Sequence, residues 1–93
     1  MKMQRFDSVW DAIEDTPAKA ANMKARAQLM MAINNTVDKW GVTQATGAKR
    51  LGLTRPRMND LIRGRISKFS LDALINLASQ AGLTVRVQIR KAA

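Results

Sequence analysis

The 93 residues allow a single small domain, and they contain neither an apolar run long enough to span a membrane nor the pattern of a signal peptide. We therefore expect a soluble, cytoplasmic protein with no membrane partner. The absence of Cys and His excludes disulfides, thiol and imidazole catalysis and His- or Cys-based metal sites, so we expect no enzyme, no catalytic residues, no metal and no cofactor. A net charge of +9 favours a polyanionic partner.

Residues 1–16 form the acidic part of this basic chain, with two basic and four acidic side chains. A short helix is expected over 8–14, with an apolar side that includes Trp10. The difference in charge between this segment and the rest indicates two surfaces with different partners. Asp11 and Glu14, together with Trp10, are candidates for contact with a second protein. The alternative is a solvated acidic helix face, with Trp10 anchored in the core.

A long helix is predicted to begin at Thr16 and Pro17, as N-cap and first helical residue, and to end at Gly41. Apolar residues recur along it at three- or four-residue spacing, which places one stripe against a core: Met23, Ala27, Met30, Ile33, Val37 and Trp40. Three shorter helices follow over 43–52, 54–64 and 70–82, each opened by a Thr or Ser cap and closed by a Gly.

The periodicity changes to two near the end of the chain. Apolar residues alternate with polar ones over 83–90, which predicts a half-buried strand whose apolar face carries Leu83, Val85, Val87 and Ile89. No other segment shows a strand pattern, and a single strand cannot satisfy its own backbone groups. We therefore expect pairing with another protein or with a second copy of this chain. Antiparallel pairing between two copies, which gives a homodimer, is the arrangement we predict.

The segment over 43–64, TQATGAKRLGLTRPRMNDLIRG, resembles the helix-turn-helix of Xre/Cro-type, lambda-repressor-like regulators. Ala48 is the small residue where the two helices cross, and Gly52 stands where the turn requires a positive φ. The residues expected between the helices are Leu51, Leu53, Met58 and Leu61. Gly47 departs from the pattern, because the family usually has a larger apolar residue at this position.

The resemblance implies that the second helix of the motif enters the major groove of double-stranded DNA. Helical spacing also turns Met58, Leu61 and Ile62 inward and leaves the polar side chains of the same helix outward. The candidates for base readout are Arg55, Pro56, Arg57, Asn59 and Asp60. The candidates for phosphate contact are Thr43, Gln44, Lys49, Thr54, Arg63 and Arg65. A homodimer would place two such helices on a palindromic operator.

Flanking segments extend the resemblance to HigA-like antitoxins, through FDSVWDAIEDTPAKAANMKARAQLMMAI before the motif and FSLDALINLASQAGLTVRVQIR after it. This resemblance implies a repressor that also neutralises a RelE/HigB-like toxin, with Trp10, Asp11 and Glu14 as candidate toxin contacts. One alternative is a plain phage-type Xre regulator without a toxin. Another is a basic module that binds RNA or a membrane surface, which the low aromatic content and the capped helix pair disfavour.

The expected fold is mainly α. It is a lambda-repressor-like helix-turn-helix bundle of about five helices with one C-terminal β-strand used for dimerisation. The expected division is an acidic segment over 1–16, a DNA-binding domain over 17–82, and a dimerisation strand and tail over 83–93.

Overall fold

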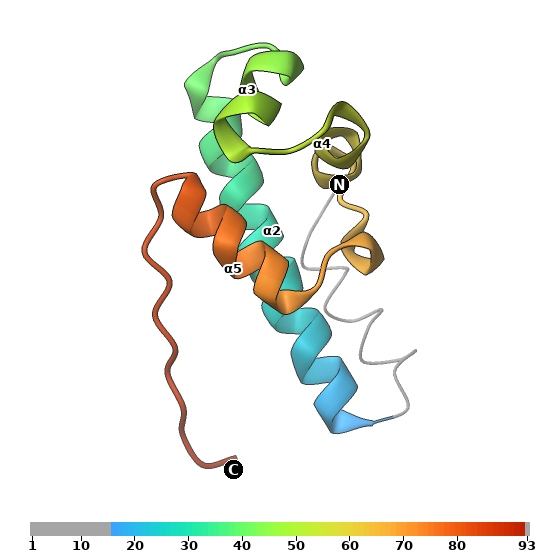
Figure 1. Cartoon of the computed structure of the whole chain (residues 1–93). Helices are drawn as coiled ribbons and strands as arrows, with labels where there is room; N and C mark the ends of the chain where they lie inside the picture. The colour runs from blue at the N-terminus through green and yellow to red at the C-terminus, as the bar shows by residue number, and fades with distance from the viewer. Residues whose placement is uncertain (1–15, 93) are drawn as a thin grey trace.

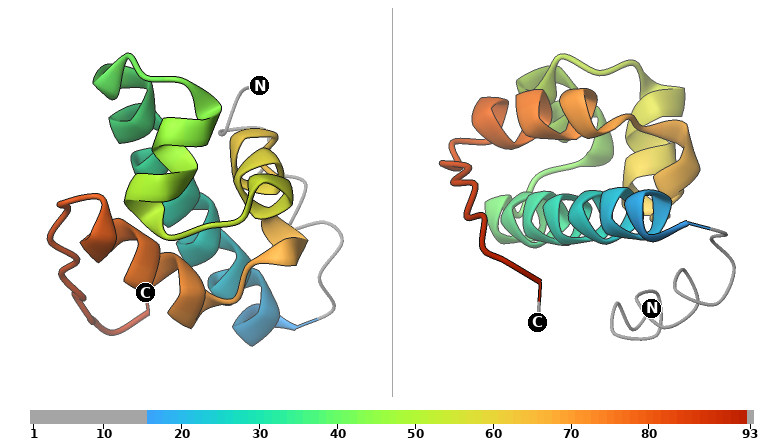
Figure 2. Two further views of the ribbon diagram at one scale, coloured as in Figure 1. Left: turned by 45° about the horizontal axis from the view of Figure 1, so that its top comes forward. Right: turned by 90° about the horizontal axis from the view of Figure 1, so that it is seen from below.

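The computed structural model describes residues 16–92, and in this range the chain forms four α-helices and one short 3₁₀ helix but no strand (Figure 1). The elements are α2 Pro17–Trp40, α3 Gln44–Leu51, α4 Arg55–Ile62, the 3₁₀ helix η1 Ile66–Lys68 and α5 Leu71–Gln80. The expected helix over 8–14 lies outside the described residues. The right-hand view of Figure 2 shows α2 running along one side of the molecule, with α4 and α5 both on the same side of it.

The long helix α2 begins and ends where the sequence predicts. The Thr16 hydroxyl oxygen accepts a hydrogen bond from the backbone N–H of Lys19 at 3.1 Å, and Pro17 occupies the first turn. Gly41 ends the helix in the left-handed region, with φ 63°. The expected stripe is confirmed by burial of Met23, Ala27, Met30 and Ile33, while Val37 and Trp40 are half-buried and pack against the same core.

The three shorter helices begin at the predicted caps. The hydroxyl oxygens of Thr43, Thr54 and Ser70 each accept a hydrogen bond from the backbone N–H three residues later, at 3.1 to 3.4 Å. This interaction satisfies one of the donors that a helix start leaves open. Between α3 and α4 the chain turns at Gly52, which has φ 69° and donates its N–H to the end of α3. The expected helix–turn–helix geometry over 43–64 is therefore present.

Gly47 has a packing role that its position in the helix does not reveal. It is buried, and a Cβ atom at this position would lie 3.0 Å from the terminal methyl of Met58. The close approach of α3 and α4 that the sequence assigns to Ala48 thus also involves its neighbour. Ala48 is itself 3% exposed. Met58 fills the volume that a larger residue at position 47 would occupy.

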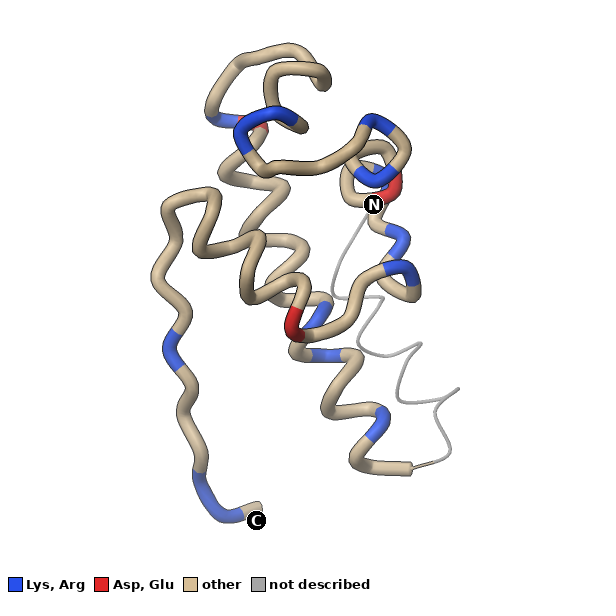
Figure 3. The backbone as a smooth tube through the Cα atoms, in the orientation of Figure 1, with Lys and Arg blue, Asp and Glu red and all other residues tan. Residues whose placement is uncertain are grey.

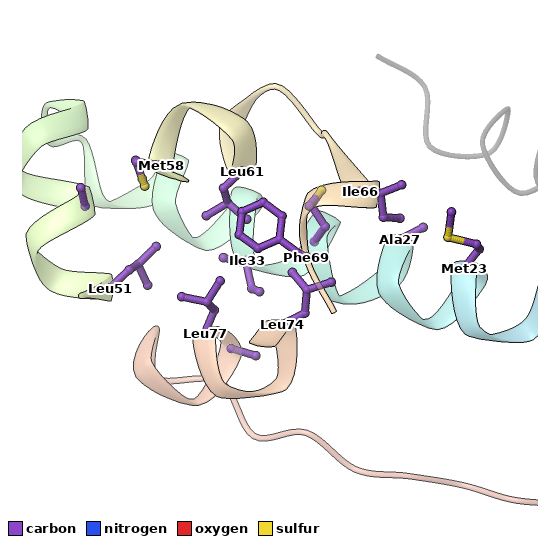
Figure 4. Close-up of a cluster of buried hydrophobic side chains, with 13 residues drawn as sticks. Met23, Ala27, Ile33, Leu51, Met58, Leu61, Ile66, Phe69, Leu74 and Leu77 are labelled. Carbon is purple, nitrogen blue, oxygen red and sulfur yellow. The ribbon is translucent and has the colours of Figure 1, made fainter. Parts of the chain in front are cut away.

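The hydrophobic core collects side chains from all five elements (Figure 4). Figure 4 shows the Phe69 ring among Ile33, Leu61 and Leu74, and all four residues are at most 1% exposed. The predicted inter-helix residues Leu51, Met58 and Leu61 are buried, and Leu53 is half-buried against them. No helix within residues 16–92 has the length and apolarity needed to cross a bilayer.

The C-terminal segment, residues 83–92, differs from the sequence prediction in this single chain. It forms neither helix nor strand, and the last backbone-to-backbone hydrogen bond within the described part of the chain joins the Leu83 N–H to the Ala78 carbonyl. The physical reason is that no second strand exists there to complete a ladder. Leu83 and Val85 pack against the core, whereas Val87 and Ile89 are 78% and 88% exposed. Strand pairing and the dimer stay predictions.

Candidate nucleic-acid interface

Basic residues cluster around the helix–turn–helix. Figure 3 shows them at the end of α3, around α4 and along the segment that follows α4. Over 43–66 there are six basic side chains and one acidic side chain. The structure thus gathers the basic part of the chain around the two helices that the resemblance assigns to DNA. Such a concentration of positive charge favours a phosphate backbone as partner.

The two capping threonines, Thr43 and Thr54, differ in whether their hydroxyl groups can still donate a hydrogen bond to a phosphate. The Thr54 hydroxyl accepts from the backbone of α4, and its own proton has no acceptor among residues 16–92. The Thr43 hydroxyl accepts the Thr46 N–H and also donates to the Thr46 hydroxyl at 3.1 Å. Thr54 can therefore donate its hydroxyl proton to an anion, while Thr43 serves mainly to cap α3. Gln44, exposed in the first turn of α3, places an amide beside that cap.

The first turn of α4 presents Arg55 and Pro56 to solvent. Within the part of the chain that the structure describes, no hydrogen bond, ion pair or ring contact involves the Arg55 guanidinium. A guanidinium in this condition keeps all of its donors for a ligand, including the pair that fits guanine O6 and N7. Arg55 is thus the predicted base-reading side chain that is best placed to reach outward.

Arg57 lies in a different environment, although it belongs to the same turn. Its guanidinium stacks over the Phe69 ring at 4.1 Å and donates a hydrogen bond to the Lys68 carbonyl at 2.6 Å. A cation–π contact of this kind contributes about 0.5–2 kcal/mol, depending on how far water is excluded. The structure therefore brings this predicted base reader together with the turn after α4.

The remaining predicted base readers are paired with predicted phosphate contacts. Asn59 Oδ1 accepts from Arg63 Nε at 3.2 Å, and Asp60 forms an ion pair with Arg65 at 2.9 Å. Reading adenine uses both the oxygen and the nitrogen of an Asn side chain, and the bond from Arg63 already occupies one of the two acceptor positions of that oxygen. These residues form two local pairs at the far end of α4, and the division between base and phosphate contacts is less sharp there than the sequence suggests.

The end of α3 carries the neighbours Lys49 and Arg50, both exposed. The Arg50 guanidinium lies 5.0 Å from the centre of the Trp40 ring, which attaches it to the end of α2. Lys49, one of the predicted phosphate contacts, has no such partner within residues 16–92. Of these two side chains, Lys49 is the one that can bind a phosphate without leaving an aromatic ring.

Sequence reasoning missed Arg26, which supports the interface from behind. Its Nη1 donates to the carbonyl of Phe69 at 3.0 Å and to the carbonyl of Ile66 at 3.4 Å, and thereby connects α2 to the turn after α4. The sequence feature that could have identified Arg26 is its position. It lies three residues after Met23 and four before Met30, next to the buried stripe. An arginine on that face needs acceptors, and the turn carbonyls supply them.

Within residues 16–92, no group of three or more Asp, Glu, His or Cys side chains is arranged to hold a metal ion. The site consists of basic, amide and hydroxyl groups on and beside two short helices. Such groups bind and position an anionic partner.

Comparisons with known proteins agree with this geometry. Residues 12–90 match the family model of a helix-turn-helix domain. The chain is similar to a solved structure named "Putative XRE Family Transcriptional Regulator", with 28% identity and a TM-score of 0.71, over 76% of this chain and 80% of that one. A search of curated proteins finds no match.

Proposed function

Because the chain belongs to the helix-turn-helix domain family, we propose that it is a sequence-specific transcriptional repressor of the Xre type that binds double-stranded DNA as a dimer. The observation that carries the proposal is the exposed first turn of α4, where Arg55 faces solvent next to a capped helix start within the most basic part of the chain. A helix presented in this way fits the major groove.

In the proposed complex, Arg55 reads a guanine and Pro56 contacts the adjoining base edge. Asn59 and Asp60 reach bases when DNA phosphates draw Arg63 and Arg65 away from them. The two phosphate backbones on either side would be held by the predicted phosphate contacts, which are Arg63, Arg65, Lys49, Gln44, Thr43 and Thr54. An exchange of this kind replaces two short-range contacts within the chain by charge-assisted contacts to the ligand.

Selection from a random duplex library tests sequence-specific binding. We expect enrichment of a palindrome whose half-sites are centred about 34–36 Å, or one helical turn, apart. The affinity for that duplex should exceed the affinity for its scrambled version by about 10³-fold or more, and both should fall steeply with salt. Equal affinity for both duplexes would contradict the proposal. Preference for single-stranded RNA or for anionic vesicles would favour the alternative basic module.

The proposed dimer uses the apolar C-terminal segment. A groove of about 510 Å³ lies between α2, α5 and this segment, and it is lined mainly by apolar side chains, among them Leu29, Ile75 and Val85. Val87 at its edge and Ile89 beyond it expose apolar surface, and the backbone of this segment has no ladder partner within residues 16–92. A second copy of the segment, paired antiparallel over 83–90, would complete the ladder and cover these side chains.

We propose further that the protein is the antitoxin of a toxin–antitoxin pair, on the basis of the resemblance to HigA-like proteins. The acidic segment, with Trp10, Asp11 and Glu14, is the candidate surface for a basic RelE/HigB-like toxin. Deletion of residues 1–14 should then weaken toxin neutralisation and leave operator binding intact. A deletion that impairs both activities together and lowers the melting temperature would show a structural role. The absence of a short basic toxin frame beside the gene would favour a plain regulator.

A further inference from the structure

The side chain of Arg57 runs from the first turn of α4 back to the segment that joins α4 to α5. Its guanidinium carbon lies 4.1 Å from the centroid of the Phe69 ring, and its Nη1 donates to the Lys68 carbonyl at 2.6 Å. The ring beneath it belongs to the core, because Phe69 is only 1% exposed. Arg57 thus connects the outward end of the proposed recognition helix directly to the hydrophobic core.

A second arginine holds the same segment from a different helix. Arg26, on α2, donates to the carbonyls of Ile66 and Phe69. Together with Arg57 it provides guanidinium donors for three carbonyl groups within four residues of chain, including that of Lys68. The turn after α4 is therefore bound to α2 on one hand and to the start of α4 on the other. This arrangement fixes the platform against which α4 rests.

Arg55 offers a natural comparison within the same helical turn. Both residues are arginines, two positions apart, but Arg55 is exposed and has no contact of this kind within residues 16–92, whereas Arg57 is half-buried and has two. To read a guanine, Arg57 would have to abandon both the ring and the carbonyl, and the carbonyl would lose its partner. Arg55 gives up nothing comparable.

We infer that Arg57 is a positioning residue of the DNA interface and not a base reader. Its guanidinium, held by the Phe69 ring and the Lys68 carbonyl, sets the direction of the first turn of α4 and hence the point at which Arg55 enters the groove. α4 has only eight residues, and its buried side chains Met58 and Leu61 lie after Arg57, so the contact of Arg57 with Phe69 and Lys68 is what attaches the first turn to the segment after the helix. This inference rests on the proposed function, because Arg55 reaches a base only in a DNA complex. The coupling between Arg57 and Phe69, however, is a property of the folded chain.

A double-mutant cycle tests the inference on the full chain. Arg57→Met keeps an unbranched stem but removes the guanidinium, Phe69→Leu removes the ring, and Arg55→Met is the matched control. Binding is measured to the palindrome selected from the random library, at a temperature where every variant is folded. We expect Arg57→Met to weaken binding about tenfold in the presence of Phe69, equivalent to about 1.4 kcal/mol, and much less in the Phe69→Leu background. Arg55→Met should cost the same factor in both backgrounds.

A scan of single base-pair changes in the selected duplex gives the second readout. A positioning residue should lower affinity for every version of the duplex, so that Arg57→Met abolishes the preference at no single base pair. Arg55→Met should abolish the preference at one base pair. Loss of preference at one base pair in Arg57→Met, or an equal loss of affinity in both Phe69 backgrounds, would overturn the inference.

Unfolding measurements separate this inference from the proposed function. If the wild-type protein shows no sequence preference, the proposed function fails, while the cycle between Arg57→Met and Phe69→Leu can still be measured by urea unfolding without DNA. If Phe69→Leu does not fold, the comparison of Arg57→Met with Arg55→Met decides. A lower melting temperature for Arg57→Met together with a uniform loss of affinity across the base-pair scan supports the positioning role, and equal melting temperatures overturn it.

Discussion

The helical body over 17–82 and the C-terminal segment over 83–92 are both rich in apolar residues. They differ in whether their backbone N–H and C=O groups are paired within residues 16–92. In the body each α-helix begins at a Thr or Ser cap, and the interior described by the structure holds no buried charged residue. In the segment, backbone pairing stops at Leu83, and exposure rises from the half-buried Val85 to 88% at Ile89.

This difference separates the structure that one chain can form by itself from the structure that needs a second strand. Helices close their hydrogen bonds within consecutive residues, so the body needs only its own core to be stable. A strand must find its partner elsewhere, and residues 16–92 contain none. We therefore expect the body to fold by itself and the segment to acquire regular structure only when it is paired.

The largest effect should come from the core of the body. Leu61 is fully buried between α4 and the other helices, so Leu61→Ala should lower the free energy of unfolding by about 2–5 kcal/mol through lost burial and a residual cavity. Ile62→Ala is the matched control, because Ile62 is 41% exposed and should lose much less. Urea unfolding followed by circular dichroism, at one fixed protein concentration, measures both. A loss for Ile62→Ala as large as that for Leu61→Ala would contradict this description of the core.

The segment should respond differently, because its apolar face is expected to matter only in the dimer. Val87→Lys places a charge on that face and should weaken dimerisation about a hundredfold, equivalent to about 2.7 kcal/mol, with helical circular dichroism unchanged. Operator affinity should fall with it. Gln88→Lys adds the same charge to the opposite face and is the control. Sedimentation measures the result, and a monomeric wild type at micromolar concentration, or a fully dimeric Val87→Lys, would contradict the proposed dimer.

Base discrimination should depend on the body and not on the segment. Arg55→Ala should cost about 1–3 kcal/mol of operator affinity and relax the preference for the operator, without changing dimerisation. Lys49→Ala should weaken operator and scrambled duplex alike, because a phosphate contact has no sequence dependence. Competition between the two duplexes distinguishes these outcomes. Equal losses on both duplexes for Arg55→Ala would remove it from base readout.

Most of the body could be predicted from local signals. The caps at Thr16, Thr43, Thr54 and Ser70 act within one helical turn, as does the positive φ at Gly52, so the sequence contains their whole cause. The buried stripe of α2 follows in the same way from helical spacing. The helix-turn-helix prediction rested on the resemblance of residues 43–64 to Xre/Cro-type regulators, and the family match over residues 12–90 supports it.

The arrangement of the interface depended on contacts that local patterns do not contain. The outward face of α4 was predicted from helical spacing, which cannot show that Arg57 turns toward Phe69, twelve residues later. The role of Arg26 was missed for the same reason, since its guanidinium donates to carbonyls some forty residues away. The short 3₁₀ helix η1 was also missed. The predicted strand over 83–90 depends on a partner strand, and residues 16–92 contain none.

The smallest expected effect lies at the contact between α3 and α4. Gly47→Ala should gain up to about 1 kcal/mol from helix propensity, and it should lose part of that gain because the new Cβ would lie 3.0 Å from the Met58 methyl. That methyl is the flexible end of its side chain, and a cavity of about 310 Å³ lined by Met58, Val37 and Val42 adjoins it. We therefore expect Gly47→Ala to be neutral or slightly stabilising in urea unfolding.

Two further variants test whether the Met58 side chain can move to make room for a side chain at position 47. Gly47→Val adds branched bulk toward Val37 and Val42 as well, and it should destabilise the body by about 1–3 kcal/mol. In a Met58→Ala background the obstacle is gone, so Gly47→Ala should there show its full helical gain. A loss above about 1 kcal/mol for Gly47→Ala alone would mean that Met58 is rigidly held, because the helix propensity of Ala can only add stability at this position. The contact between α3 and α4 would then depend on glycine itself.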